Sequence, residues 1–403
     1  MKALFSLTIC CAIAFCCSAQ DTLDYDFKLP SKAFEKERKF YVHLPERYYS
    51  NPHDTFGVVY VTDAQAASFY NNAKGIIDYL VWSYQISPMI VVGIHNDNRS
   101  REFIPLDKSK AADAEGNNGQ AEKLRQQLEE EIFPFVDSAF RVNTFKALVG
   151  HSRGGAFVAN TIFSDKHDMF NAYISISPGM HYLNRQILKE AADIIPTKPA
   201  FHNFYFCTYG TVGSLEAYFE PQVKYLDSLF EAHPNPTIHW EMAEMTNKSH
   251  WGTVAPSLTE GLLRMNRAYQ VDQALIQEFS AHKDKGLKEQ VDAYYAQQKE
   301  KLGHTVPMNA PNLNYYGNEM LEMGEAERAV ELFDLALELN DKETRIYFGK
   351  AEALRRTKQI DAAKEVLKEI SVLLEKNEAG LSEEDVAKRK RWVKEELEEL
   401  ENE

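Results

Sequence analysis

The stretch FKALVGHSRGGAF, residues 145–157, decides the fold that the sequence predicts. An apolar run at 145–149 leads directly into Gly150-His151-Ser152-Arg153-Gly154, and a small-residue helical pattern follows at 155–163. The form G-x-S-x-G is typical of a strained strand-to-helix turn that exposes its serine, and the two glycines let the backbones come close. The pentapeptide alone is a weak signal, and a small-residue turn without chemistry is the alternative. Because both flanks fit the motif, we interpret Ser152 as a candidate nucleophile.

Apolar runs alternate with helical patterns around this turn. Strands are expected at 39–44, 57–62, 89–94, 145–149, 172–177, 204–208 and 237–243, and helices at 120–136 and 155–163, among others. Continuous apolar runs indicate strands buried on both faces, and alternation with helices favours a mainly parallel sheet covered on both sides. The first run precedes any crossover helix, so we expect an antiparallel edge strand at 39–44. The fold class is therefore α/β.

The composition changes near residue 265. Thirteen of the 15 prolines precede this point, and charged helical sequence follows it. Residues separated by 34 positions correspond, such as Gly317 with Ala351 and Ala329 with Ala363. A 34-residue helix–turn–helix period is the tetratricopeptide signature. One clear and one degenerate repeat are too few for independent stability, so we expect flanking helices at 266–300 and 384–402 to complete an all-α tetratricopeptide-like domain.

The first 19 residues have the pattern of a secretory signal peptide. Lys2 precedes an apolar run at 3–17, and small residues end at Ala19, before Gln20. Fifteen residues are fewer than the roughly 20 that span a bilayer; a membrane anchor or a lipoprotein is the alternative. The expected division is a signal peptide at 1–19, an α/β domain at 20–265 and a helical domain at 266–403. Export to the periplasm or beyond follows from this reading.

Removal of the signal would take four of the five cysteines with it. The remaining Cys207 lies in an apolar run and is expected to be a buried structural residue rather than a thiol nucleophile. The formal net charge of −15 argues against a nucleic-acid partner. With 44% hydrophobic and 26% charged residues, the chain has the composition of a folded globular protein.

A serine hydroxyl needs a base to remove its proton, and in this fold the chain order is Ser, then Asp or Glu, then His. His250 follows the last predicted strand and lies in the expected loop at 245–252. His239 lies within that strand, and His233 precedes a Pro-Asn-Pro turn. His151 adjoins the nucleophile, but the turn directs its side chain elsewhere. We therefore predict His250 as the base.

The acid that orients the histidine should follow the strand at 204–208. Glu216 is the candidate there, and Glu220, one helical turn later, is its nearest rival. Glu241 and Glu244 lie on or beside the next strand. An alternative role for Glu216 is that of a helix N-terminal charge favoured by the helix dipole.

An oxyanion requires preorganised donors. The backbone N–H of Arg153, directly after the candidate nucleophile, is one. The loop after the strand at 57–62 should supply the other, and we predict the N–H of Gln65.

Five segments resemble the esterase-D/enterochelin-esterase type of α/β-hydrolase: 56–65 (FGVVYVTDAQ), 90–105 (IVVGIHNDNRSREFIP), 130–140 (EEIFPFVDSAF), 149–157 (VGHSRGGAF) and 170–178 (FNAYISISP). The resemblance covers roughly residues 30–265. It implies an α/β-hydrolase fold with the triad Ser152, Glu216 and His250 and with oxyanion donors at Gln65 and Arg153. Feruloyl, acetyl-xylan and siderophore esterases and mycolyltransferases belong to this group. Arg153 departs from the pattern, since an apolar residue is frequent at its position.

The resemblance implies a cofactor-independent serine ester hydrolase that works through an acyl-enzyme. Siderophores, feruloyl or acetyl groups on polysaccharides and simple short esters all stay open as substrates. An acyltransferase of the same fold is the enzymatic alternative, and a non-catalytic tetratricopeptide interaction protein is the alternative from another class. The sequence contains no metal-binding or nucleotide-binding motif. A protein partner is expected, if at all, at the helical domain.

Overall fold

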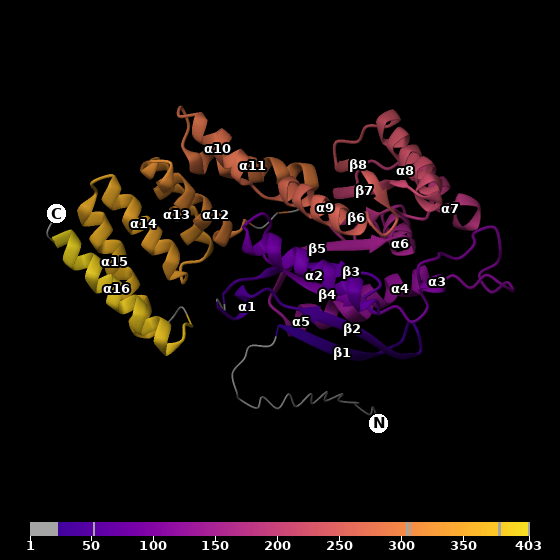
Figure 1. Ribbon diagram of the computed structural model, residues 1–403, viewed down its shortest axis with the longest axis horizontal. Helices are drawn as coiled ribbons and strands as arrows, with labels where there is room; N and C mark the ends of the chain where they lie inside the picture. Colours follow the sequence, from indigo (N-terminus) through magenta and orange to yellow (C-terminus); the bar gives the residue numbers. More distant parts are fainter. Residues whose placement is uncertain (1–22, 51–52, 304, 306–307, 378–379, 402–403) are drawn as a thin grey trace, which may run out of the picture.

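The computed structural model describes residues 23–50, 53–303, 305, 308–377 and 380–401; the predicted signal peptide lies outside them. Their strands form a single sheet in the order β1-β2-β4-β3-β5-β6-β7-β8 (Figure 1). The strands are β1 (Asp24–Ser31), β2 (Lys36–His43), β3 (Phe56–Val61), β4 (Met89–Ile94), β5 (Val142–His151), β6 (Ala172–Ile176), β7 (Asn203–Val212) and β8 (Ile238–Ser249). From β4 to β8 all neighbours are parallel, which confirms the predicted mainly parallel sheet.

The sheet begins with an antiparallel hairpin that corrects one prediction. The strand expected at 39–44 is β2, and it is antiparallel to β4 as predicted. It is not the edge, because β1 pairs along its outer side. The signal for β1 was present: Tyr25, Phe27 and Leu29 alternate with polar residues, which is the period-two pattern of a half-buried strand.

The last strand is longer than predicted. It was expected at 237–243, followed by a loop, but β8 continues to Ser249 beside the extended end of β7. The polar residues of this extension lack the apolar pattern of a buried strand, because most of them face solvent. His250 therefore follows the strand directly.

Helices cover both faces of the sheet. Val59 and Val61 of β3 face one hydrophobic cluster, whereas Val58 and Tyr60 face another, as expected for a strand buried on both sides. On the first face lie α2 (Ala67–Trp82) and α9 (Val254–Tyr269). On the second lie α4 (Ala121–Gln127), the π-helical turn η1 (Leu128–Ile132), α5 (Phe133–Ala139), α6 (Arg153–Ile162), α7 (Tyr182–Ile194) and α8 (Ser214–Ala232). Two short helices, α1 (Arg47–Ser50) and α3 (Arg99–Glu102), lie in loops.

The chain after α9 is helical. It forms α10 (Gln273–Ala281), α11 (Leu287–Leu302), α12 (Ala310–Glu322), α13 (Ala326–Leu339), α14 (Thr344–Arg356), α15 (Ile360–Lys376) and α16 (Glu383–Glu401). The pairs α12–α13 and α14–α15 begin at residues 310 and 326 and at residues 344 and 360, so equivalent helices start 34 residues apart. A Cβ on Gly317 would lie 2.7 Å from Phe333, so the small residue is needed where the helices approach. The tetratricopeptide assignment itself stays a prediction.

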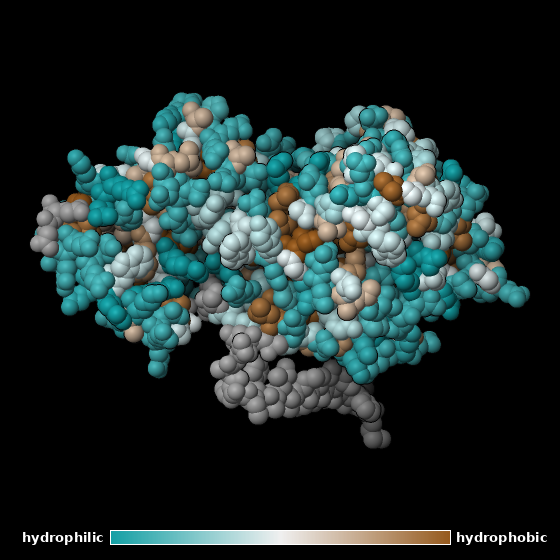
Figure 2. Space-filling model, viewed as in Figure 1, coloured by the Kyte–Doolittle hydropathy of each residue, from teal (hydrophilic) through white to brown (hydrophobic). Residues whose placement is uncertain are grey.

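The helical region packs against the α/β region through apolar and polar contacts. A single hydrophobic cluster runs from β3 and α9 into α10–α13, and α9 itself continues past residue 265. The Asn340 side chain donates to Asp54 at 2.9 Å, and Arg47 lies 3.5 Å from Glu343. On the face in view in Figure 2, hydrophilic residues cover most of α14–α16.

Candidate active site

The turn after β5 has the geometry that its sequence predicts. Ser152 has φ 60° and ψ −114°, a left-handed conformation that costs energy in a residue other than glycine. Its N–H donates to the Ile176 carbonyl at 2.9 Å, which ties the turn to β6. A Cβ on Gly150 would lie 2.4 Å from the Gly154 backbone, so this glycine is required by the close approach. Ser152 is half-buried on this strained turn, between strand and helix.

Glu216 and His250 meet at the end of the sheet next to this turn. Glu216 lies in the first turn of α8 and is fully buried, and its Oε1 accepts a hydrogen bond of 2.6 Å from His250 Nδ1. The second oxygen, Oε2, accepts from the Gly210 N–H and, at 3.1 Å, from the Ser177 hydroxyl. Burial raises the pKa of Glu216, but the hydrogen bonds from His250 and Gly210 outweigh it, so the pKa lies below its ordinary value. The carboxylate is therefore ionised at neutral pH.

The rival acids have other partners. Glu220, one turn later on α8, binds Lys224 at 2.5 Å. Glu241 binds His239 and Arg264. Glu244 accepts a hydrogen bond from Tyr209 at 3.2 Å. The geometry thus brings Glu216, and not these glutamates, to His250.

His151, next to Ser152 on the turn, contacts His250. Its ring centroid lies 4.4 Å from that of His250, and its Nε2–H donates to the His250 carbonyl at 3.0 Å. Burial lowers the pKa of His151 to about 3, so the ring is neutral. The same carbonyl accepts from the Thr253 hydroxyl at 2.8 Å. His151 and Thr253 both hold the His250 backbone in place. The sequence pattern did not indicate the role of His151 because this contact spans 99 positions.

The predicted oxyanion donors lie on the two loops that flank the nucleophile. A Cβ on Gly154 would lie 2.4 Å from Thr62 Oγ1 and 3.3 Å from Asp63 Oδ2, so the loop after β3 contacts the turn. Within the described residues, neither the N–H of Gln65 nor that of Arg153 has a protein acceptor. The N–H of Arg153 directly follows the serine, and that of Gln65 lies on a loop that contacts the turn, so both are candidates for the donors that an oxyanion requires.

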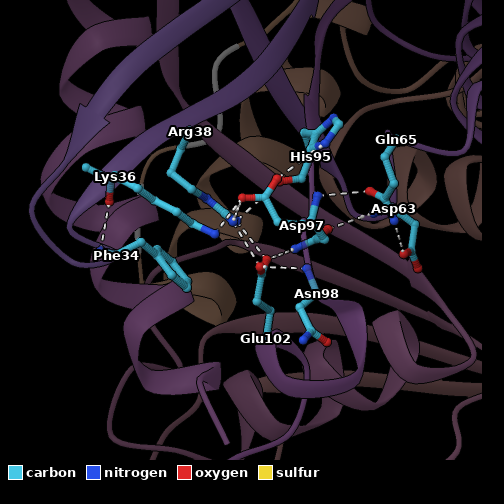
Figure 3. Close-up of polar contacts among 11 residues, drawn as sticks. Phe34, Lys36, Arg38, Asp63, Gln65, His95, Asp97, Asn98 and Glu102 are labelled. Carbon is cyan, nitrogen blue, oxygen red and sulfur yellow. Dashed lines mark hydrogen bonds and ion pairs between the residues drawn. The ribbon is translucent and has the colours of Figure 1, made fainter.

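A buried polar network holds the Gln65 loop (Figure 3). The Gln65 amide donates to Asp63 at 2.8 Å and accepts from the Asn96 N–H at 2.9 Å. Asn96 in turn accepts from the Asp63 N–H at 3.0 Å and donates to Glu102 at 2.9 Å. Arg38, on β2, makes two hydrogen bonds to Glu102, of 2.9 and 2.7 Å. The loop is thus anchored to a strand more than 20 positions earlier in the chain.

The Arg38–Glu102 pair is buried on both sides, since each side chain is 1% exposed. Burial raises the pKa of Glu102, but the Arg38 hydrogen bonds and charge outweigh it and leave the pKa below its ordinary value of 4.5. Removing Glu102 would leave the buried Arg38 guanidinium with the partly exposed Asp97 carboxylate, 2.9 Å from Nη1, as its ion-pair partner, and the loss of a buried partner is strongly destabilising.

We therefore predict that Glu102→Gln lowers the free energy of unfolding by about 3 kcal/mol, measured by urea denaturation at neutral pH. Because the folded pKa is depressed, the contribution of Glu102 is complete above pH 4.5 and is lost as the pH falls through the folded pKa. The difference between wild type and variant should accordingly shrink in acid. Glu129→Gln, which removes an exposed pair with Lys166, is the control and should cost less than about 1 kcal/mol. Equal losses for both variants would contradict the role of the buried pair.

Comparisons with known proteins identify the family of the chain. The profile of the family described as "Putative esterase" matches residues 31–297, more than half of the chain. The chain is a member of this esterase family. The siderophore enterobactin esterase of Emericella nidulans is 30% identical over 186 residues, 40% of this chain and 61% of that protein. The ferri-bacillibactin esterase BesA of Bacillus subtilis is 25% identical over 170 residues, 38% of this chain and 58% of that protein. The esterase-family chain thus spans about three fifths of these relatives.

Solved structures share the fold of this esterase-family member. An IroE-like serine hydrolase from Shewanella oneidensis superposes with a TM-score of 0.63 at 21% identity, over 78% of this chain and 99% of that chain. An uncharacterised protein from Capnocytophaga ochracea gives 0.61 at 12% identity, over 86% and 92%. These likenesses confirm the predicted α/β-hydrolase fold.

The part of the chain that the structure describes contains one cysteine, Cys207. Cys207 is fully buried, and burial raises the pKa of its thiol far above the ordinary value, so it is not a thiolate nucleophile. Among the residues that the structure describes, no cluster of three His, Cys, Asp or Glu side chains could hold a metal ion. In the same part of the chain, every helix is too short or too polar to cross a membrane.

Proposed function

We propose that the protein hydrolyses carboxylic esters through a Ser152–His250–Glu216 triad and an acyl-enzyme. The observation that carries the proposal is the buried 2.6 Å hydrogen bond between Glu216 and His250, next to the strained turn that holds Ser152. Membership in the esterase family supports the reaction class.

The two half-reactions follow from the roles of these groups. His250 Nε2 takes the hydroxyl proton while Ser152 Oγ attacks the ester carbonyl carbon. The N–H groups of Gln65 and Arg153 stabilise the oxyanion. His250 then returns the proton to the departing alcohol oxygen, and the serine stays acylated. Water, deprotonated by His250, attacks the acyl carbon. The bond from this carbon to Ser152 Oγ breaks, His250 returns the proton to Oγ, and the carboxylic acid leaves, so that one water is consumed for each ester cleaved.

Siderophore esters are the substrate class that the two named relatives favour. The surroundings of the triad support an aromatic group on the substrate. Trp251 is 74% exposed with its ring centroid 5.5 Å from that of His250. Tyr218, 49% exposed, lies beside Phe219, whose ring centroid is 5.2 Å from that of His250. The rings of Trp251 and Tyr218 are free to stack on an aryl group. Feruloyl esters would use the same surface, whereas an acetyl ester would leave it unused.

The test compares p-nitrophenyl esters, feruloyl esters and ferric siderophores as substrates of the mature protein, and adds labelling by a fluorophosphonate. Hydrolysis and labelling at Ser152 are expected. Folded protein that is neither labelled nor active would contradict the proposal and favour a non-catalytic interaction protein. Acyl transfer to a sugar hydroxyl with little hydrolysis would identify a transferase.

We also propose export and a two-part organisation of the mature chain. Export rests on the sequence of residues 1–19, and it predicts that the secreted protein begins at Gln20. The helical part, 266–403, supplies none of the five proposed catalytic positions, which all precede residue 251. We assign it a role in docking on the α/β part, supported by the Asn340–Asp54 contact, or in recruiting a protein partner.

A further inference from the structure

The side chain of Arg153 presents a positive charge beside the candidate nucleophile. Its Nε donates to the Tyr182 hydroxyl at 2.5 Å, and its Nη1 donates to the hydroxyl of Ser100. Tyr182 begins α7 and Ser100 belongs to α3, so two neighbouring elements fix the guanidinium next to the turn. Because both partners are neutral hydroxyls, they orient the guanidinium without cancelling its charge.

Two other arginines, Arg99 and Arg38, are paired with carboxylates. Arg99 makes two hydrogen bonds to Asp63, of 2.8 and 2.9 Å, and Arg38 makes two to Glu102. Within the described residues, by contrast, no carboxylate lies within ion-pair distance of Arg153. Burial and the charge of Arg153 both lower the pKa of the nearby His181. In a chain of net charge −15, the position favours an anion supplied from outside.

The guanidinium also has donors to spare. It carries five N–H groups, and two are engaged by hydroxyls. Among the described residues, Nη2 has no protein acceptor. It is not a buried atom, so it is accessible to a substrate. A fixed planar fork with free donors matches the two oxygens of a carboxylate or a similar anionic group.

We propose that Arg153 binds an anionic oxygen group of the ester substrate and makes the enzyme select anionic esters over neutral ones. The inference rests on the proposed ester hydrolysis and adds a substrate class to it. Arg153 acts here through its side chain, separately from its backbone N–H in the oxyanion site. Its replacement should therefore change the ratio of activities on charged and neutral esters, which a purely structural role would not do.

The experiment measures kcat/KM for two matched pairs of esters. On the acyl side, p-nitrophenyl hemisuccinate is compared with p-nitrophenyl butyrate; on the alcohol side, para-acetoxybenzoate is compared with para-acetoxybenzamide. We expect the wild type to prefer the anion in at least one pair by about 10- to 100-fold, as for a charge-assisted hydrogen bond. Arg153→Met should bring that ratio close to one, and Arg153→Lys should keep part of it. Lys123→Met, an exposed position on α4, removes the same charge and should leave the ratio unchanged.

The outcomes separate this inference from the proposed function. If the wild type hydrolyses the neutral esters but prefers the anion in neither pair, or if Arg153→Met keeps the preference, the inference is wrong and the hydrolase survives. If the wild type cleaves none of the four esters and does not react with a fluorophosphonate, the proposed function itself fails. A preference that weakens with added salt in the wild type alone would support the ionic contact.

Discussion

Ser152→Ala is expected to reduce kcat on a p-nitrophenyl ester by a factor on the order of 10⁴–10⁶ and to abolish labelling by a fluorophosphonate. The reason is that the acyl group has no other acceptor. The buried thiol of Cys207 is protonated and inaccessible, and His151 is neutral but engaged with the His250 carbonyl. Activity left in the variant should reflect only the oxyanion donors and substrate binding.

The control for this variant is Ser164→Ala, which removes a hydroxyl bound to the Thr161 carbonyl just beyond α6. It should keep both activity and labelling. Circular dichroism and thermal unfolding should show that Ser152→Ala remains folded. A folded Ser152→Ala protein with more than a tenth of wild-type activity would move the nucleophile elsewhere.

His250→Ala should be nearly as damaging, since the nucleophile and its base act as one unit and their losses do not add. The double variant Ser152→Ala/His250→Ala should therefore be no worse than either single variant. Additive losses, measured under the same conditions, would indicate that the two residues act separately.

The sequence predicted those parts of the molecule that depend on neighbouring residues. The turn around Ser152 is local: strand, glycines and helix are contiguous, and the strained φ of Ser152 follows from them. The strands buried on both faces were also readable, because their apolar runs are continuous. The edge strand β1 was not predicted, although its apolar and polar residues alternate. The sequence alone does not show that this segment pairs with β2.

The supporting shell could not be predicted because it depends on long-range contacts. The Arg38–Glu102 pair joins residues 64 positions apart, and neither residue belongs to a motif that names the other. The contact between His151 and the His250 carbonyl spans 99 positions. The choice between Glu216 and Glu220 was open for a related reason. Both lie on one helix, and the sequence does not show which of them faces the interior next to His250.

The hydrogen bonds of Glu216 make its replacement the most informative test of which glutamate is the acid of the triad. Its two oxygens have different hydrogen-bond partners. Oε1 accepts from His250 Nδ1, whereas Oε2 accepts from the Gly210 N–H and the Ser177 hydroxyl. A glutamine cannot satisfy both sides. With its amide nitrogen toward His250, it donates to Nδ1 and holds the proton on Nε2, where the base must be free. With its amide oxygen toward His250, the nitrogen meets the Gly210 N–H, and two donors face each other.

We therefore expect Glu216→Gln to reduce kcat by about 10²–10⁴, with the fold intact, because the first orientation stabilises the wrong imidazole tautomer. Glu220→Gln is the matched control: it lies one turn away, binds Lys224 near the surface, and should cost less than a few-fold. Both variants are compared with the wild type on one p-nitrophenyl ester. The reverse ranking would assign the acid to Glu220. Full activity of both would leave a Ser152–His250 dyad, in which the 2.6 Å hydrogen bond to Glu216 holds the loop but contributes nothing to the reaction.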